Sequence, residues 1–501
     1  MRIGIRGVLS LLAVVVAVPL TVDADSTLAS VRSETQLQLG DLLFEDQRFW
    51  ESMSAYELAK EGAKPDQLMR ASVGMLRSLL QAAEFNRAYQ EAVFLRELQP
   101  IDSRVLALYA DGLWAAGLFE EAEATYREIL DDDSSSAGAR HGLGRSLAAQ
   151  NDLERALMEV QASLTPDAPP EYHHTLAAIY RRQGQYPEAA EALDKYVAGI
   201  ATGNRREKAE WARSEARFLR SFGSDVPLDI DAVDQVQTNR FRLVNDKIVV
   251  RGRINGQALT DLVVDTGAEQ MVLSKETAQQ FGVRPIVNSL SAGVGEVGFR
   301  ALELGRVDSL EVATLAVRNL PALIRNPPLT GLPTRRVPDS FSPLAFGLSV
   351  IIDYRNHHLT FAQNLPTEPA DFELPMRVHR LALVRGVVNE EHHKSFVVDT
   401  GGEVISISLA TADVLNMRPV RRIPLLAYGT SGWDQDAFLL PGVNLAFNQI
   451  LYENFPVVVL NLHRPSVLLG FHIGGIIGHN FLSNYRVTLD LERSLLRLAT
   501  N

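Results

Sequence analysis

The sequence contains no cysteine in its 501 residues. This absence excludes disulfide bonds, a thiolate nucleophile, zinc sites built on cysteine and a lipid anchor on an N-terminal cysteine. The histidines do not indicate a metal site either. Adjacent histidines, at 357–358 and 392–393, point to opposite faces of a strand, so we interpret them as surface hairpin residues. No metal site is therefore expected.

Positively charged residues are also scarce relative to negatively charged ones. Asp and Glu number 61 against 49 Lys and Arg, which gives a formal net charge of -12 at pH 7. An acidic chain has no general attraction for nucleic acid or for an anionic membrane surface. We expect no nucleic-acid partner. The length exceeds that of one ordinary hydrophobic core, so two or three domains are expected.

Long hydrophobic runs are missing except at the N-terminus. There, residues 8–20 are apolar, follow Arg2 and Arg6, and precede the small-residue segment Val22-Asp23-Ala24. This order predicts a signal peptide over 1–24, with an uncleaved anchor as the alternative. The run is short for a membrane span. We expect a periplasmic or secreted protein with no stable membrane insertion after cleavage.

Residues 35–223 carry a helical repeat of about 34 residues. Each period has an apolar or aromatic anchor, with a small residue three positions later. The pairs are Phe49 and Ser52, Phe85 and Ala88, Phe119 and Ala122, Leu153 and Ala156, and Tyr186 and Ala189. Small residues at fixed positions let helices approach closely, and the spacing resembles the tetratricopeptide repeat.

The repeat pattern predicts an all-α solenoid of about five helix pairs, closed by a capping helix over 204–222. We interpret Trp114, Tyr126 and Tyr180 as packing residues. Solenoids present a concave surface to other proteins. We therefore expect a protein partner on the array, with a structural spacer as the alternative.

A different internal duplication follows a linker at 224–239. Apolar strands run directly into Asp-Thr-Gly at 262–268 and again at 396–402. The offset of 134 residues between Asp265 and Asp399 also relates Asn255 to Asn389. The duplication predicts two all-β lobes, 240–365 and 376–501.

Local signals define elements inside the lobes. Asn255-Gly256 between two apolar runs predicts a hairpin, and Ser274 predicts the N-cap of a short helix. Segments 350–354 and 487–491 echo each other, and Asp353 and Asp490 are expected to bond turn amides.

The two copies together resemble the pepsin and retropepsin superfamily of aspartic proteases. The resemblance rests on two Asp-Thr-Gly motifs on apolar strands, each followed by a glycine-containing hairpin. Residues 475–478, Gly-Ile-Ile-Gly, are similar to the apolar-apolar-Gly element of that family, whereas the first copy has residues 337–343 in that place. The resemblance implies two lobes and one cleft in a single chain, as in pepsins.

By the same resemblance, Asp265 and Asp399 form a catalytic dyad. Thr266 and Thr400 would cross-bond the two turns, and the glycines would permit close backbone approach; these are Gly267 and Gly401. Two close carboxylates share one proton, so one activates a water while the other protonates the carbonyl oxygen. The mechanism requires no cofactor and no metal.

The glycine-rich hairpins would act as mobile covers that grip substrate. The candidate residues are Gly293, Gly295, Tyr428 and Gly429. The expected function is an exported aspartic endopeptidase that hydrolyses a polypeptide substrate recruited by the helical array. The alternative is a catalytically inactive, protease-like peptide-binding scaffold. A further possibility is that the lobes act in a larger oligomer.

The residues that follow the two motifs suggest a pH range. Ala268 and Gly402 stand where pepsins often have a hydroxyl beside the dyad. A hydroxyl donor stabilises the ionised carboxylate and lowers its pKa. Its absence leads us to hypothesise an activity optimum nearer neutral than that of pepsin.

Overall fold

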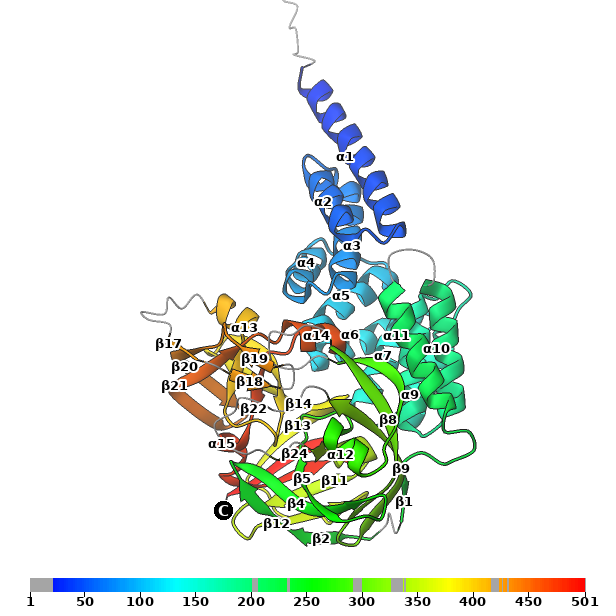
Figure 1. Cartoon of the computed structure of the whole chain (residues 1–501). Helices are drawn as coiled ribbons and strands as arrows, with labels where there is room; N and C mark the ends of the chain where they lie inside the picture. The colour runs from blue at the N-terminus through cyan, green and yellow to red at the C-terminus, as the bar shows by residue number, and fades with distance from the viewer. Residues whose placement is uncertain are drawn as a thin grey trace, which may run out of the picture. The chain divides into compact units, whose positions relative to one another are not determined.

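The computed structural model describes residues 21–200, 206–231, 235–291, 300–325, 337, 339–415, 423–425, 427–429 and 432–500. The chain divides into two compact units, 1–78 and 79–501 (Figure 1). Of the predicted signal peptide, residues 1–20 lie outside the described part, and Thr21 begins the first helix. No helix of the described part is long and apolar enough to cross a membrane.

Helices make up the described chain up to residue 220. They are α1 (Thr21–Glu45), α2 (Phe49–Lys60), α3 (Pro65–Gln81), α4 (Phe85–Glu97), α5 (Ser103–Ala115), α6 (Phe119–Asp132), α7 (Ala137–Ala149), α8 (Leu153–Ala162), α9 (Pro170–Arg182), α10 (Tyr186–Ile200) and α11 (Arg206–Arg220). Helix α11 occupies the place of the predicted capping helix.

The repeat pattern of the sequence coincides with the helix pairs. Each of the five anchors is the first residue of a second helix, namely α2, α4, α6, α8 and α10. The small residue three positions later has an exposed fraction of 0% in all five cases. The predicted tetratricopeptide-like α-solenoid is therefore confirmed. Trp114 and Tyr126 are buried as predicted, and the Tyr126 hydroxyl donates to Asp111 at 2.6 Å.

The first lobe is a sheet closed on itself by the pairing of β8 with both β4 and β9. Its strands are β1 (Asp229–Ile230), β3 (Arg242–Val244), β4 (Lys247–Ile254), β5 (Leu259–Val264), β6 (Met271–Ser274), β7 (Pro285–Ser291), β8 (Arg300–Val312), β9 (Leu315–Arg325) and β10 (Ser340–Phe341). The predicted Asn255-Gly256 hairpin joins β4 to β5, with φ of 51° and 65° at its two residues. Such left-handed values suit Asn and Gly.

The second lobe repeats this arrangement. Its strands are β14 (Leu381–Val388), β15 (His392–Val398), β16 (Ser406–Ser408), β17 (Ile423–Pro424), β20 (Phe438–Phe447), β21 (Ile450–Leu460) and β22 (Gly475–Ile477). In the first lobe, strand pairing runs β4, β5, β10, β6, β9, β8 and back to β4. In the second it runs β14, β15, β22, β16, β21, β20 and back to β14, with the same parallel and antiparallel pairs. The internal duplication is thus a duplication of topology.

A six-stranded segment of sheet is shared between the lobes, and its last strand continues the second-lobe sheet by pairing with β14. Its order is β2 (Gln237–Arg240), β12 (His358–Ala362), β11 (Ser349–Asp353), β23 (Tyr485–Asp490), β24 (Leu495–Thr500) and β13 (Phe372–His379). At its centre β11 and β23 pair antiparallel, so the two segments that echo each other in sequence lie side by side. Asp353 and Asp490 accept from turn amides at 2.8 and 3.0 Å, as predicted. Strands β1 and β2 come from the segment predicted as a linker.

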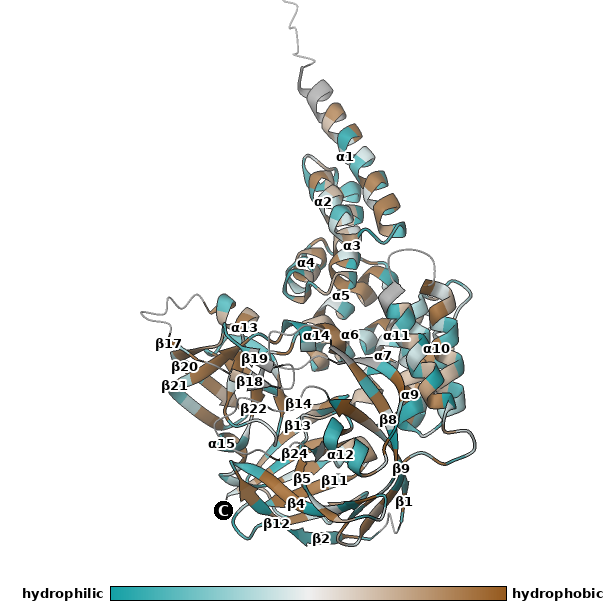
Figure 2. Ribbon diagram, in the orientation of Figure 1, coloured by the Kyte–Doolittle hydropathy of each residue, from teal (hydrophilic) through white to brown (hydrophobic). Residues whose placement is uncertain are grey.

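Short helices follow the strands: α12 (Lys275–Gln280), α13 (Leu409–Val414), α14 (His463–Leu469) and α15 (His479–Leu482). Ser274 caps α12 as predicted, accepting from the Thr277 amide at 3.1 Å. Hydrophobic colour covers much of β14 in Figure 2. One core cluster joins residues of both lobes, and another joins the helices from α5 onward to residues of both lobes.

Candidate active site

Each Asp-Thr-Gly turn begins where a buried strand ends. Asp265 follows β5, and its amide donates to the Phe341 carbonyl on β10 at 2.9 Å; Asp399 follows β15, and its amide donates to the Ile477 carbonyl on β22 at 3.0 Å. Strands β10 and β22 run parallel to β5 and β15. Ser340-Phe341 therefore fills the position of the second copy's Ile-Ile, although no glycine follows it.

The two turns are interlocked by their threonines. Thr266 Oγ1 donates to the Val398 carbonyl at 2.7 Å and accepts from the Thr400 amide at 3.0 Å. Thr400 Oγ1 makes the mirror pair, with the Val264 carbonyl at 2.7 Å and the Thr266 amide at 3.0 Å. Both threonines are 1% exposed. Four hydrogen bonds therefore hold the two turns in one relative position.

The glycines bring each turn against the opposite carboxylate. A Cβ atom at Gly267 would lie 2.5 Å from Asp399 Cγ, and one at Gly401 would lie 2.5 Å from Asp265 Oδ1. These distances are too short for any side chain, so only glycine fits. Each aspartate also accepts from the glycine amide of its own turn, at 3.0 Å in the first and 2.7 Å in the second. The structure thus brings together Asp265 and Asp399 with their predicted supporting residues.

The electrostatics of the pair favour a shared proton. Burial raises the pKa of Asp265 above the usual range, and the charge of Asp399 and a hydrogen bond with it raise the pKa further. The Gly267 amide and the charge of Lys247 act in the opposite direction. Two carboxyl groups this close ionise one at a time. The pair therefore holds one proton over a range in which a free aspartate holds none.

Two ion pairs across the lobe boundary flank the turns. Arg380 Nε of the second lobe donates to Glu269 Oε2 at 2.8 Å, and Lys247 Nζ of the first lobe lies 3.4 Å from Glu403 Oε1. Glu269 and Glu403 each lie four residues after the aspartate of their turn, and the 134-residue offset relates them. That offset was a signal in the sequence that could have identified them as site residues.

A buried carboxylate holds the N-terminal cap of α12 in the first lobe. Asp339 accepts from the Ser274 amide at 2.6 Å and from Thr277 Oγ1 at 2.6 Å. Burial raises the pKa of Asp339, and the hydrogen bonds from Thr277 and Ser274 lower it. In the second lobe Ser408 Oγ lies 2.9 Å from His472 Nε2 at the corresponding cap. Neither Asp339 nor His472 carried a recognisable motif.

Of the four predicted cover residues, two lie outside the described residues and two lie in a strand. Gly293 and Gly295 lie outside the described residues. Tyr428 and Gly429 lie in β18 (Ala427–Gly429), which pairs with β19 (Gly432–Asp434) as a two-stranded hairpin.

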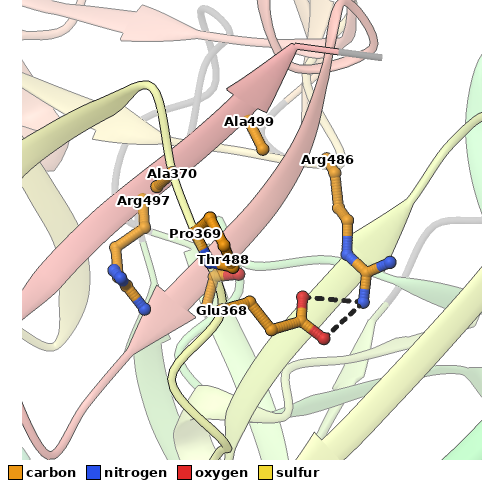
Figure 3. Close-up of a pocket in the computed structure, with 7 residues that line it drawn as sticks. All are labelled: Glu368, Pro369, Ala370, Arg486, Thr488, Arg497 and Ala499. Atoms are coloured by element: carbon orange, nitrogen blue, oxygen red, sulfur yellow. Dashed lines mark hydrogen bonds and ion pairs between the residues drawn. The ribbon is translucent and has the colours of Figure 1, made fainter.

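A small hollow lies on the shared sheet rather than at the predicted site. It is lined by Glu368, Pro369, Ala370, Arg486, Thr488, Arg497 and Ala499 (Figure 3). The Glu368 carboxylate and the Arg486 guanidinium form an ion pair there at 2.8 Å. Arg497 is likewise paired, with Glu373 at 2.8 Å. The hollow contains none of the predicted site residues.

Two equivalent β lobes, a shared sheet and interlocked Asp-Thr-Gly turns define the aspartic-protease class of fold. Comparison with known families agrees: residues 250–332 match the family of the gag-polyprotein putative aspartyl protease. Residues 103–128 and 170–195 match the tetratricopeptide repeat. The chain therefore carries an aspartyl-protease-like domain and tetratricopeptide repeats. No curated protein matches the chain.

The chain is also similar to solved structures of repeat proteins. A thermophilic TPR protein of Thermus thermophilus is 19% identical, with a TM-score of 0.31, over 37% of this chain and 98% of that one. MamA of Desulfovibrio magneticus RS-1 is 16% identical, with a TM-score of 0.26, over 34% and 96%. Pseudomonas aeruginosa pilF is 15% identical, with a TM-score of 0.28, over 38% and 86%.

Proposed function

We propose that this protein is an exported aspartic endopeptidase of the periplasm or the extracellular space, with Asp265 and Asp399 as its catalytic dyad. The observation that carries the proposal is the interlocked pair of turns, in which each glycine faces the opposite carboxylate. The N-terminal pattern of Arg2, Arg6 and an apolar run supports export. The polypeptide substrate would lie between the lobes.

The chemistry follows from one proton shared by two carboxyl groups. The ionised carboxylate takes a proton from water as the water oxygen attacks the peptide carbonyl carbon. The protonated carboxyl gives its proton to the carbonyl oxygen, which forms a neutral tetrahedral intermediate. Collapse of that intermediate breaks the C–N bond: the leaving nitrogen takes a proton from one carboxyl group, and the other carboxylate takes a proton from a hydroxyl of the intermediate, which restores the single proton of the dyad. One water is consumed and one amide bond becomes an acid and an amine.

The raised pKa of Asp265 supports activity at higher pH than free aspartates would permit, because the catalytic proton is lost only above that pKa. The tetratricopeptide repeats support a role in binding protein, since such repeats generally mediate protein–protein interaction. We infer that a protein partner or the substrate itself binds the array.

The test is cleavage of a mixed peptide library by the chain lacking residues 1–24, from pH 3 to 8. The Asp265→Asn and Asp399→Asn variants are run beside it. Each variant is expected to lose activity by at least about 100-fold, the typical share of general acid–base catalysis. Thr238→Ser, on the shared sheet and exposed, is the control and should keep full activity. A folded chain that cuts nothing at any pH would instead indicate a peptide-binding scaffold.

A further inference from the structure

The tight turn between β13 and β14, residues 378–381, is bound by the helical array, and we name it the docking turn. The ring of His379 lies 5.9 Å from the ring of Trp114 on α5, edge to face. Arg182 Nη1, at the end of α9, donates to the Val378 carbonyl at 3.2 Å. The docking turn thus contacts helices that are about 70 residues apart in the chain.

The helices around the docking turn are the first helices of three successive repeats, α5, α7 and α9. Arg145 of α7 stacks its guanidinium over Trp114 at 4.4 Å and pairs with Asp111 at 2.7 Å. Burial first, and then the charges of Arg380, Arg145, Arg182 and His174, lower the pKa of His379 to about 3. His379 is therefore neutral at physiological pH and binds as an uncharged aromatic ring. Solenoids use an extended concave surface to bind their ligands.

Further bonds attach α5 and α6 to the second lobe around the docking turn. The His472 amide donates to the Ala115 carbonyl at 2.7 Å, and Ser395 Oγ donates to the Gly117 carbonyl at 2.6 Å. Phe119 packs edge to face on Phe471 at 5.0 Å. Gly117 has φ of 81°, and a Cβ there would lie 3.0 Å from Ser395 Oγ, so a side chain at this position would be strained. The contact is thus specific and includes backbone groups of both parts.

On its other side the docking turn reaches the first catalytic turn. Arg380 stands at the tip with φ of 63°, a left-handed conformation that is costly for a residue with a side chain. Its guanidinium donates to Glu269 at 2.8 Å and to the Leu468 carbonyl at 3.2 Å. Glu269 lies four residues after Asp265. A continuous path of contacts therefore runs from the array through Arg380 to the turn of Asp265.

The duplication supplies a built-in comparison. The corresponding pair, Lys247 with Glu403, flanks the turn of Asp399, and the turn before Lys247 contains Asp246, which lies 3.9 Å from His479. Lys247 and Asp246 thus contact residues of the second lobe. The array thus reaches the Asp265 turn through the Arg380–Glu269 ion pair, whereas it meets the Asp399 side through Ser395 on β15.

We propose that the helical array is a positioning part of the active centre: α5, α7 and α9 bind the docking turn, and Arg380 thereby orients Glu269 and the Asp265 turn. Arg380 is a positioning residue, since it acts through Glu269. This inference rests on the proposed function for its catalytic meaning. The structural link between the array and the Asp265 turn does not depend on catalytic activity. A protein bound to the array would reach the catalytic turn through the same contacts.

The test measures hydrogen exchange in the full chain for His379→Ala, Trp114→Ala, Arg380→Met and Arg380→Lys, with Lys247→Met as the matched control. We expect His379→Ala, Trp114→Ala and Arg380→Met to speed exchange about tenfold in peptides covering 262–270, without change in 396–404. Lys247→Met should show the reverse. Arg380→Lys keeps the charge and should restore protection. His379→Ala leaves the interior of the array intact, so it remains informative if Trp114→Ala fails to fold.

Two results would overturn the proposal. One is faster exchange of the docking turn in His379→Ala with unchanged exchange at 262–270. The other is equal acceleration in both catalytic turns, which would indicate general destabilisation. Cleavage kinetics on the same variants should show a fall in kcat with little change in KM, since the positioned group is the dyad. A chain that lacks cleavage but shows the asymmetric exchange pattern would contradict the proposed function and leave the coupling standing.

Discussion

The carboxyl group of Asp265 lies beside that of Asp399, and this proximity makes the stability of the protein depend on pH. In the unfolded chain an aspartate titrates near pH 3.9. In the folded chain the pKa of Asp265 is raised, by burial first and then by Asp399. Over the range between the two values the folded state binds more protons than the unfolded state. The stability contributed by this group is therefore complete at low pH and is lost as pH rises through the folded pKa.

This linkage predicts the effect of Asp265→Asn on stability. The amide mimics the protonated acid and cannot ionise, so the variant should gain stability relative to the native chain as pH rises. We expect a gain of at least about 1 kcal/mol between pH 4 and pH 8, the equivalent of roughly one pKa unit. Urea unfolding at both pH values measures it. Asp308→Asn, an exposed position in the same lobe, should show no such pH-dependent gain.

The glycines of the turns give a second prediction at the scale of the residue. Gly267→Ala places a methyl group 2.5 Å from Asp399 Cγ, so the turns must separate. We expect a loss of about 1–3 kcal/mol of unfolding free energy, together with loss of cleavage. Gly402→Ala is the matched control, because its Cβ meets Asp399 Oδ2 at 3.1 Å and the first copy has Ala268 there. Equal effects of the two substitutions would contradict the steric argument.

At the scale of elements, the connection between the two turns depends on hydroxyl groups. Thr266→Val keeps the shape of the side chain but removes both the bond to the Val398 carbonyl and the acceptor for the Thr400 amide. Two buried polar groups would lose their partners, at a cost of about 2–4 kcal/mol. Denaturant unfolding measures this cost. Thr266→Ser retains the hydroxyl and should recover most of the stability; a serine variant as weak as valine would show that packing dominates.

Elements differ in how much of their structure could be predicted from local chemistry. The Asn255-Gly256 hairpin, the Ser274 cap and the helix starts at the repeat anchors follow from groups only a few residues apart. Strand β10 was not predicted, because Ser340-Phe341 lacks the glycine of the second copy. Its identity follows from pairing with β5, about 77 residues earlier in the chain.

At the scale of the whole molecule, the lobes share a sheet and a core. Strand β23 of the second lobe pairs with β11, which follows the first lobe, over four residue pairs. Ending the chain after Asn484 removes β23 and β24, which leaves the edge of β11 unpaired and opens the common core. We expect such a chain to lose the cooperative unfolding transition of both lobes, measured by near-ultraviolet circular dichroism during heating. A retained sharp transition would show that the first lobe folds by itself.

The amino-acid pattern alone predicts that the N-terminal part is an α-helical repeat and that the C-terminal part is a duplicated β domain. It also locates the five repeat anchors and the two Asp-Thr-Gly turns. These features repeat along the chain or depend on neighbouring residues, so their periods and offsets are visible in the sequence. Glu269 and Glu403 share the 134-residue offset of the dyad, and their position was therefore accessible.

The partners of those residues became visible only in the folded protein. Arg380 pairs with a residue 111 positions earlier, and His379 packs on Trp114 from a different domain. No local pattern marks either of them, because their environment is created by surfaces that meet only after each part has folded. The energy of an ion pair or a ring contact depends on distance and burial, and both quantities arise from packing rather than from the order of residues.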